Sequence, residues 1–264
     1  YLECCRVNLY YIFKRRDDMD NIAIDVKNVS VKFNLAMAKY DGLKEYVINL
    51  IKGRVLYQEF QALKDVSFQV AKGEALGIVG FNGSGKSTLL KVIAGILRPD
   101  SGKAKVYGSI APLIELGAGF DHNLTAKENI FFNGALRAIP RKKIQEKYDE
   151  IVDFAELHDF IDVPIKNFSS GMRARLGFAA AIMFDPDVLI ADEVLSTGDY
   201  KFKAKCETKI NQMRKNGLTI LFVSHHAAQV KNVCSKAIWL DKGQIKMHGN
   251  TDEVCKAYEN SNKK

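Results

Sequence analysis

Residues 80–87 read Gly-Phe-Asn-Gly-Ser-Gly-Lys-Ser, a spacing of glycines, one lysine and one hydroxyl that can hold phosphate. The glycines let backbone N–H groups turn inward around phosphate oxygens, and a helix that starts here adds partial positive charge. Lys86 is placed to reach the β- and γ-phosphates, and the Ser87 hydroxyl to ligate magnesium. This phosphate loop predicts a nucleoside triphosphate site. Its predicted contact residues are Gly80, Phe81, Asn82, Gly83, Ser84, Gly85, Lys86, Ser87 and Thr88.

Two adjacent carboxylates, Asp192 and Glu193, follow the apolar run 188–191. A carboxylate at a strand tip beside a phosphate loop can hold magnesium through water, which is the role we expect for Asp192. Glu193, one residue further on, is then placed to polarise the attacking water as a general base. We therefore predict that Glu193 and Lys86 are catalytic and that Ser87 and Asp192 are metal ligands.

A second apolar run, 220–223, is followed by Ser224, His225 and His226. A histidine that leaves a strand at the same sheet edge can contact the γ-phosphate and orient both Glu193 and the water. Taken alone, such a histidine is more often an ordinary surface residue. Its position in this order of segments favours a catalytic role for His225, whereas His226 is expected to face solvent.

The segment Ser169-Ser170-Gly171-Met172 precedes an apolar, helix-like stretch. A serine turn at a helix start is another anion site, because hydroxyls, bare amides and the helix dipole point the same way. The chain thus carries two phosphate-binding features, some eighty residues apart.

In this order the segments resemble the ABC ATPase family, over residues 22–258. The glycine loop corresponds to the Walker A motif, "FSSGM" stands where the family usually has LSGGQ, and "VLIADE" corresponds to Walker B. "STGD" corresponds to the D-loop with Asp199, and His225 to the switch histidine. The resemblance implies ATP and Mg²⁺ as cofactors. It also implies a homodimer in which the serine turn of one subunit caps the ATP of the other.

Longer strings, such as "NFSSGMRARLGFAAAI" and "DEVLSTGDYKFKAKC", look like the ATPase subunits of teichoic-acid, O-antigen and capsular-polysaccharide exporters. That resemblance implies an integral-membrane permease as a partner, a lipid-linked glycan handled indirectly, and a place on the cytoplasmic face of a bacterial membrane. The alternatives are an ABC ATPase of another transporter class and a soluble ABC ATPase that takes no part in transport.

Two features depart from the usual family pattern. Where the family has a magnesium-sensing glutamine, this chain has Glu115 or its neighbour Leu116, and we expect the Glu115 carboxylate to reach the metal through water. The adenine is expected to stack on Phe33, with Tyr57 as the alternative, although about twenty extra residues intervene. Within them, residues 39–51 have helical apolar spacing. This helix either contacts the membrane subunit or packs on the neighbouring strands.

The predicted site residues must be positioned by an α/β fold. We expect a P-loop NTPase core sheet, an N-terminal antiparallel β-subdomain and an inserted helical subdomain at about 120–185. Strands are expected at 74–79, 188–191 and 220–223, and a helix at 87–97. A hairpin turning at 241–243 and a short helix from Thr251 complete the expected elements. We expect one ABC ATPase domain over residues 19–264.

The 264 residues carry a net charge of +8, with lysines and arginines spread along the whole length. Nucleic-acid binding needs basic residues on one face, so the distribution favours a solvated surface with some affinity for anionic membranes. The five scattered cysteines indicate free thiols. Apolar runs are shorter than the roughly 18 residues of a membrane span. Residues 1–18 are expected to be a non-native extension preceding Met19, or else a membrane-surface arm.

Overall fold

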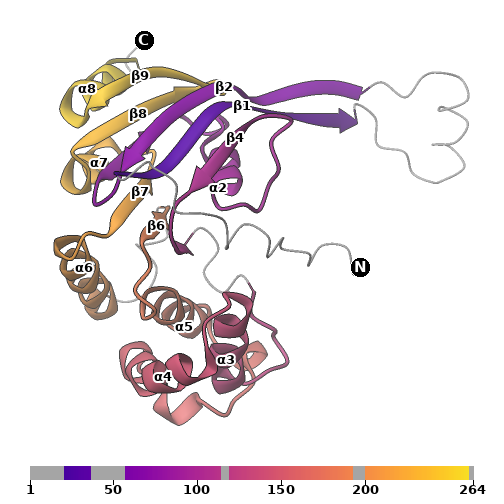
Figure 1. The fold of residues 1–264 in the computed structure, drawn as a ribbon, viewed down its shortest axis with the longest axis vertical. Coiled ribbons are helices and arrows are strands. Elements are labelled where there is room, and N and C mark those ends of the chain that lie inside the picture. The colour runs from indigo at the N-terminus through magenta and orange to yellow at the C-terminus, as the bar shows by residue number, and fades with distance from the viewer. Residues whose placement is uncertain (1–20, 37–56, 114–118, 193–199, 262–264) are drawn as a thin grey trace, which may run out of the picture.

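The computed structural model describes residues 21–36, 57–113, 119–192 and 200–261. Two β-sheets lie at one end of the molecule, and the helices of residues 126–182 gather at the other end (Figure 1). This mixed arrangement confirms the predicted α/β class with an antiparallel sheet beside a larger core sheet.

The antiparallel sheet has the strand order β2-β1-β4. Its strands are β1 (Ile22–Ala36), β2 (Tyr57–Ala71) and β4 (Ser101–Val106). β1 and β2 pair along almost their full lengths, whereas β4 pairs only with residues 24–30 of β1. The far ends of β1 and β2 therefore project past β4 as a two-stranded arm (Figure 1).

The core sheet has the described strand order β5-β6-β7-β3-β8-β9, with β9 antiparallel to its neighbour and the others parallel. Its strands are β3 (Ala75–Val79), β5 (Ile110–Pro112), β6 (Val188–Ala191), β7 (Thr219–Val223), β8 (Lys236–Asp241) and β9 (Gln244–Asn250). Every residue of β3, β6 and β7 is buried. Strands covered on both faces are apolar throughout, which explains why these runs were recognisable.

Helix α2 (Lys86–Ile93) lies between the two sheets. Its side chains Leu89, Leu90, Val92 and Ile93 are buried in a core to which both sheets contribute. The helix ends four residues before the predicted boundary at 97, because Gly95 adopts a left-handed conformation (φ 74°). The N–H groups of residues 96 and 97 then turn back to the Lys91 carbonyl, which is a usual way to end a helix.

The helices at the other end are α3 (Ala126–Leu136), α4 (Arg141–Ala155) and α5 (Ser170–Ile182), with 3₁₀ turns at His158–Phe160 and Ile165–Asn167. A second core joins them to the core sheet and to α6 (Tyr200–Lys215) and α7 (Ala227–Val233). The Arg137 guanidinium strengthens this joint by donating to the carbonyls of Ala180, Ala181 and Ile110. Burial lowers the pKa of Arg137.

The β8–β9 hairpin turns at Lys242 and Gly243, and both residues have positive φ. Two such residues form the tight turn whose twist matches that of the flanking strands, so the predicted hairpin is confirmed. The helix expected from Thr251 is α8 (Thr251–Ser261). Among the helices that the structure describes, none has both the length and the apolar character needed to cross a membrane.

Candidate functional site

Three neighbouring parallel strands bring the predicted chemical groups to one edge of the core sheet. In β6, β7 and β3, residues Ala191, Phe222 and Gly77 stand side by side in register. Asp192 follows β6 directly, His225 follows two residues after β7, and the phosphate loop follows β3. Since the carboxyl ends of parallel strands form one edge, the structure gathers these segments where ligands bind in such sheets.

The lysine of the phosphate loop hydrogen-bonds to the backbone of the loop itself. Lys86 Nζ donates to the carbonyl oxygens of Gly80 at 2.7 Å and Phe81 at 2.9 Å. The Ser84 N–H donates to the same Phe81 carbonyl at 3.1 Å. The ammonium group therefore lies over the first two residues of the loop, at the start of α2.

The loop is backed by main chain of two other segments. Gly85 precedes α2 with φ 101°, and a Cβ there would lie 2.5 Å from the carbonyl oxygen of Ala62 in β2. A Cβ on Gly80 would lie 2.3 Å from the carbonyl oxygen of Leu240 in β8. The Gly243 N–H donates to the Ser84 carbonyl at 2.9 Å. Space thus requires glycine at both positions, and the positive φ of Gly85 requires it there a second time.

The first turn of α2 presents backbone donors without a side-chain cap. The cap residue is Gly85, and no described side chain accepts from the first N–H groups of this helix. The opening N–H groups of any helix lack intrahelical acceptors, so an anion can take them. Ser87 is exposed and Thr88 half-buried beside them.

His225 and His226 are both exposed beyond β7, with ring centroids 3.8 Å apart. The turn that carries them is fixed by Ser224, which is fully buried. Ser224 Oγ accepts the His226 N–H at 2.9 Å and donates to Gln229 Oε1 at 2.8 Å. A backbone held in this way carries the His225 imidazole at the sheet edge, and Asp192 is half-buried there.

The serine turn caps its own helix. Ser169 Oγ accepts the Met172 N–H at 3.1 Å and so forms the N-cap of α5. Ser169 and Ser170 are exposed, and a Cβ on Gly171 would meet only Ser169 Oγ, at 3.8 Å. A hydroxyl that accepts one hydrogen bond still has its own hydrogen to donate. The turn is therefore open at the surface and able to donate to an anion.

Farther along α5 from the serine turn, three phenylalanines form a cluster with one ring from each of three helices. In this phenylalanine junction, Phe154 of α4 and Phe178 of α5 lie 5.9 Å apart between ring centroids. Phe202 of α6 lies 5.7 Å from the first ring and 6.1 Å from the second. The Arg175 guanidinium lies 5.1 Å from the Phe202 ring, a cation–π contact. The junction ties the helix of the serine turn to α6, the first described element after Asp192.

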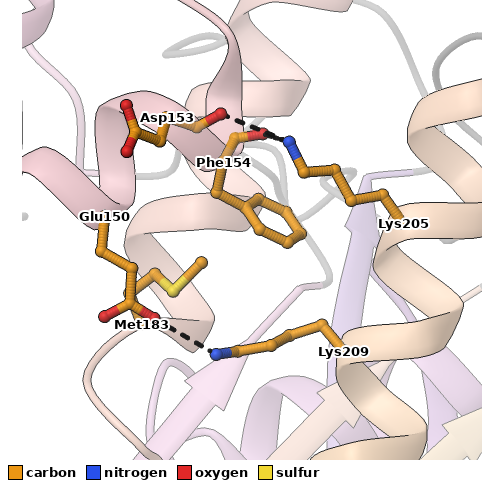
Figure 2. Close-up of a pocket in the computed structure, with 6 residues that line it drawn as sticks. All are labelled: Glu150, Asp153, Phe154, Met183, Lys205 and Lys209. Atoms are coloured by element: carbon orange, nitrogen blue, oxygen red, sulfur yellow. Dashed lines mark hydrogen bonds and ion pairs between the residues drawn. The ribbon is translucent and has the colours of Figure 1, made fainter.

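Side chains of α6 also fasten the end of α4. Figure 2 shows Lys205 and Lys209 reaching toward α4 around a shallow pocket that contains Phe154 and Met183. Lys205 Nζ donates to the Phe154 carbonyl at 3.0 Å, and Lys209 Nζ to Glu150 Oε1 at 3.4 Å. A cation at the last carbonyls of a helix also complements the helix dipole.

Glu156 links all three helices. This residue ends α4 in a left-handed conformation, and it accepts from Lys205 of α6 and from Arg175 of α5. The hydrogen bond from Lys205, followed by that from Arg175, lowers the pKa of Glu156. Lys209 pairs with Glu150 at the pocket, and Lys205 pairs with Glu156 beside it, so these contacts make the region a structural joint.

Comparison with known proteins places the chain in a family. Residues 63–196 match the family model described as ABC transporter. The chain is 40% identical to the O-antigen export system ATP-binding protein RfbB of Klebsiella pneumoniae, over 89% of this chain and 97% of that relative. The chain belongs to the ABC transporter family.

Other relatives of this ABC chain are longer. It is 42% identical to the teichoic acids export ATP-binding protein TagH of Bacillus anthracis over 92% of its own residues, which span only 44% of TagH. Among solved structures, it superposes on an ATP-binding subunit of an ABC transporter with a TM-score of 0.70 at 21% identity, covering 90% of this chain and 93% of that one. This likeness confirms the predicted fold.

Three predicted site residues of the ABC chain lie outside the described residues: Glu193, Asp199 and Glu115. The helix expected at 39–51 also lies outside them. Phe33 is described, and it stands on the projecting arm with 38% of its surface exposed. Tyr57 is the first residue of β2, opposite Ala36.

Sequence reasoning missed partners that only the fold of the ABC chain brings together. Phe60 lies directly opposite Phe33 in the β1–β2 pair and is 46% exposed, so the arm carries two aromatic rings on one face. Knowing the register of β1 and β2 would have revealed Phe60. Tyr258 of α8 packs against the phosphate loop, and no local pattern marks it.

Proposed function

We propose that this chain is the ATP-hydrolysing subunit of an exporter of lipid-linked cell-surface polysaccharide or teichoic acid. The observation that carries the proposal is the 40% identity with RfbB along 97% of that protein, which is named for O-antigen export. TagH, named for teichoic acid export, supports the same substrate class. The proposed chemistry rests on the residues at the sheet edge.

In this proposal ATP places its phosphates on the N-terminus of α2, where backbone donors are available. Lys86 exchanges its two loop carbonyls for the β- and γ-phosphates. Ser87 and Asp192 offer a hydroxyl and a carboxylate at the same edge, and oxygen ligands of this kind are those that Mg²⁺ prefers. Bound Mg²⁺ neutralises charge on the phosphates. Glu115 would complete the metal ligands.

Hydrolysis then depends on Glu193 and His225. Glu193 follows Asp192 in the chain and would accept a proton from the attacking water. His225 would contact the γ-phosphate and hold the water in line. Phosphoryl transfer relies mainly on such positioning and on charge neutralisation.

The second half of each site comes, in this proposal, from another copy of the chain. The serine turn, residues 169–172, in which both serines are exposed, would cap the ATP held by the partner's phosphate loop, with Ser169 Oγ donating to a phosphate oxygen. Asp199 would lie at the contact between the two copies. Phe33 and Phe60 would flank the adenine. Closure of this homodimer would drive an integral-membrane permease from the cytoplasmic face of the membrane.

The test of the ATPase proposal is Glu193→Gln. This variant keeps the shape of the side chain but removes the base, so ATP affinity is expected to stay near that of the wild type. Turnover should fall by about 100-fold or more, and size-exclusion chromatography with Mg-ATP should show a trapped dimer. Unchanged turnover in this variant would exclude Glu193 as the base.

A separate experiment tests the transport class. The tagged chain, purified from detergent-solubilised membranes, is expected to carry an integral-membrane permease identifiable by mass spectrometry. ATP turnover in liposomes containing this pair should rise when lipid-linked glycan is added. Turnover that responds only to amino acids or drugs would assign the chain to another transporter class.

A further inference from the structure

Tyr258 of the C-terminal helix α8 reaches the phosphate loop from a distant part of the chain. Its side chain is only 3% exposed. The ring centroid lies 5.0 Å from that of Phe81, the second residue of the loop, and 6.0 Å from that of Trp239 in β8. Phe81 also offers its carbonyl to Lys86, so the ring of Tyr258 supports the part of the loop on which the lysine rests.

The hydroxyl of the same side chain points to the other half of the site. Tyr258 Oη donates to the carbonyl oxygen of His225 at 3.3 Å. One buried residue thus contacts both the phosphate loop and the backbone that carries the His225 imidazole.

The helix that carries Tyr258 is itself firmly placed. Thr251 Oγ1 donates to the Cys234 carbonyl at 2.9 Å, and Cys255 Sγ lies 3.8 Å from the Ala227 carbonyl. At the exposed side, Lys231 Nζ pairs with Glu259 at 3.1 Å. These contacts fasten α8 along α7, the helix that begins just after His226. The Tyr258 hydroxyl therefore approaches His225 from a rigid support.

We propose that Tyr258 is a positioning residue for ATP hydrolysis, which fixes the backbone of His225 relative to the phosphate loop. The inference rests on the proposed role of His225 at the γ-phosphate. Tyr258 touches no reacting atom, and it acts only through where it holds the imidazole. Small displacements of a catalytic group cost rate because the reaction depends on geometry.

The experiment measures steady-state ATP hydrolysis by the full chain with saturating Mg²⁺ in four forms: wild type, Tyr258→Phe, His225→Ala and the double variant. Tyr258→Phe keeps the ring on Phe81 and removes the hydrogen bond to the His225 carbonyl. We expect kcat to fall by about 3- to 10-fold, the rate equivalent of one hydrogen bond. The KM for ATP should change by less than about 2-fold, since the ring that supports the loop remains.

The double variant separates positioning from general structure. If Tyr258 acts through His225, Tyr258→Phe has no further effect on kcat once His225 is alanine. Tyr148→Phe is the matched control, because Tyr148 is a half-buried tyrosine of α4 stacked on Phe131, and it should leave kcat unchanged. A second variant, Tyr258→Leu, removes the ring and should raise the KM for ATP as well.

Two results would overturn the proposal: an unchanged kcat in Tyr258→Phe, or an equal fold reduction with and without His225. Failure of the underlying function is distinguishable, because His225→Ala and Glu193→Gln would then both hydrolyse ATP at the wild-type rate. Thermal unfolding of each variant identifies any loss of kcat that follows loss of folded protein, and such a loss counts against positioning.

Discussion

The phosphate loop and the serine turn both present the start of a helix to solvent, but they are held in different ways. At α2 the cap residue is Gly85, and carbonyl groups of β2 and β8 pack directly behind the loop. At α5 the cap is Ser169, which satisfies the Met172 N–H within its own turn, and side chains hold the helix farther along, at Arg175 and Phe178. Main chain backs the first site, whereas packed rings and ion pairs hold the helix that carries the second.

Because of this difference, we expect the two sites to tolerate substitutions to different extents. Carbonyl groups cannot move without disturbing the sheets, so the phosphate loop has no room for a Cβ at Gly80 or Gly85. Side chains can adjust, and the serine turn is open to solvent on its outer face. We expect substitutions at the loop to abolish function outright and substitutions at the turn to have graded effects.

The largest effect is expected for Gly85→Ala. The added Cβ would lie 2.5 Å from the Ala62 carbonyl, in a residue whose φ of 101° already disfavours a side chain. ATP affinity should fall by at least about 1000-fold, or about 4 kcal/mol, as measured by isothermal titration calorimetry.

Gly171→Ala is the matched control for stability at the other helix start. Its Cβ would have open space, and alanine is a better helix residue than glycine by about 0.5–1 kcal/mol. The free energy of unfolding in urea should therefore be retained or rise. A large loss of stability in Gly171→Ala would show that the serine turn is as tightly enclosed as the loop.

Next in size is Phe202→Ala in the phenylalanine junction. The ring is 2% exposed and contacts both other rings, so its removal leaves a cavity between three helices. The free energy of unfolding should fall by about 3 kcal/mol, with ATP affinity nearly unchanged in the folded fraction.

Phe202→Leu fills most of that cavity and should lose less stability. Urea denaturation followed by circular dichroism measures both variants. If ATP affinity falls as much in Phe202→Ala as in Gly85→Ala, the two regions are not independent, and the comparison between them fails.

The sequence predicts the parts of the fold and of the site that depend on local residue patterns. The buried strands at 75–79, 188–191 and 219–223 were recognisable because parallel strands need continuous apolar runs. The order of the phosphate loop, Asp192 and His225 followed from those strands. The fold and the residues at the sheet edge could therefore be predicted from the sequence.

The supporting contacts were not accessible in the same way. The Ala62 carbonyl behind Gly85 depends on how β2 crosses the core sheet, and the junction of Phe154, Phe178 and Phe202 joins residues up to 48 positions apart. Each of these residues looks like ordinary core in the sequence. Their partners are determined by packing between residues far apart in the sequence, and the spacing of residues in the sequence does not predict such contacts.

A smaller effect is expected at the cap of α5. Ser169→Ala removes the acceptor for the Met172 N–H, and loss of an N-cap typically costs about 1 kcal/mol of stability. Ser170→Ala, one residue into the helix, has no such role and should leave the free energy of unfolding within about 0.5 kcal/mol. Urea titration of both variants measures the difference. Equal losses would show that Ser169 is not the cap in solution.

The smallest effect concerns the charge that joins α4, α5 and α6. The hydrogen bonds from Lys205 and Arg175 lower the pKa of Glu156 in the folded chain, so its ionised form stabilises the fold above the ordinary glutamate pKa of about 4.3. That contribution is lost as the pH falls through the lowered value. Because the side chain is 52% exposed, solvent screening limits the contribution to about 0.5 kcal/mol.

Glu156→Gln tests this directly, since glutamine has the same length without the charge. At pH 7 the variant should unfold at slightly lower urea concentration than the wild type, and the gap should close as the pH falls below about 4, where Glu156 becomes protonated. Glu146→Gln on the same helix is the control, because Glu146 is exposed and no ion pair is described for it, so at pH 7 the free energy of unfolding should stay within about 0.5 kcal/mol of the wild type. A difference in stability that persists at low pH would mean that Glu156 acts through the backbone conformation at the end of α4 and not through its charge. The contact between α4, α5 and α6 would then depend on the backbone, as the phosphate loop does.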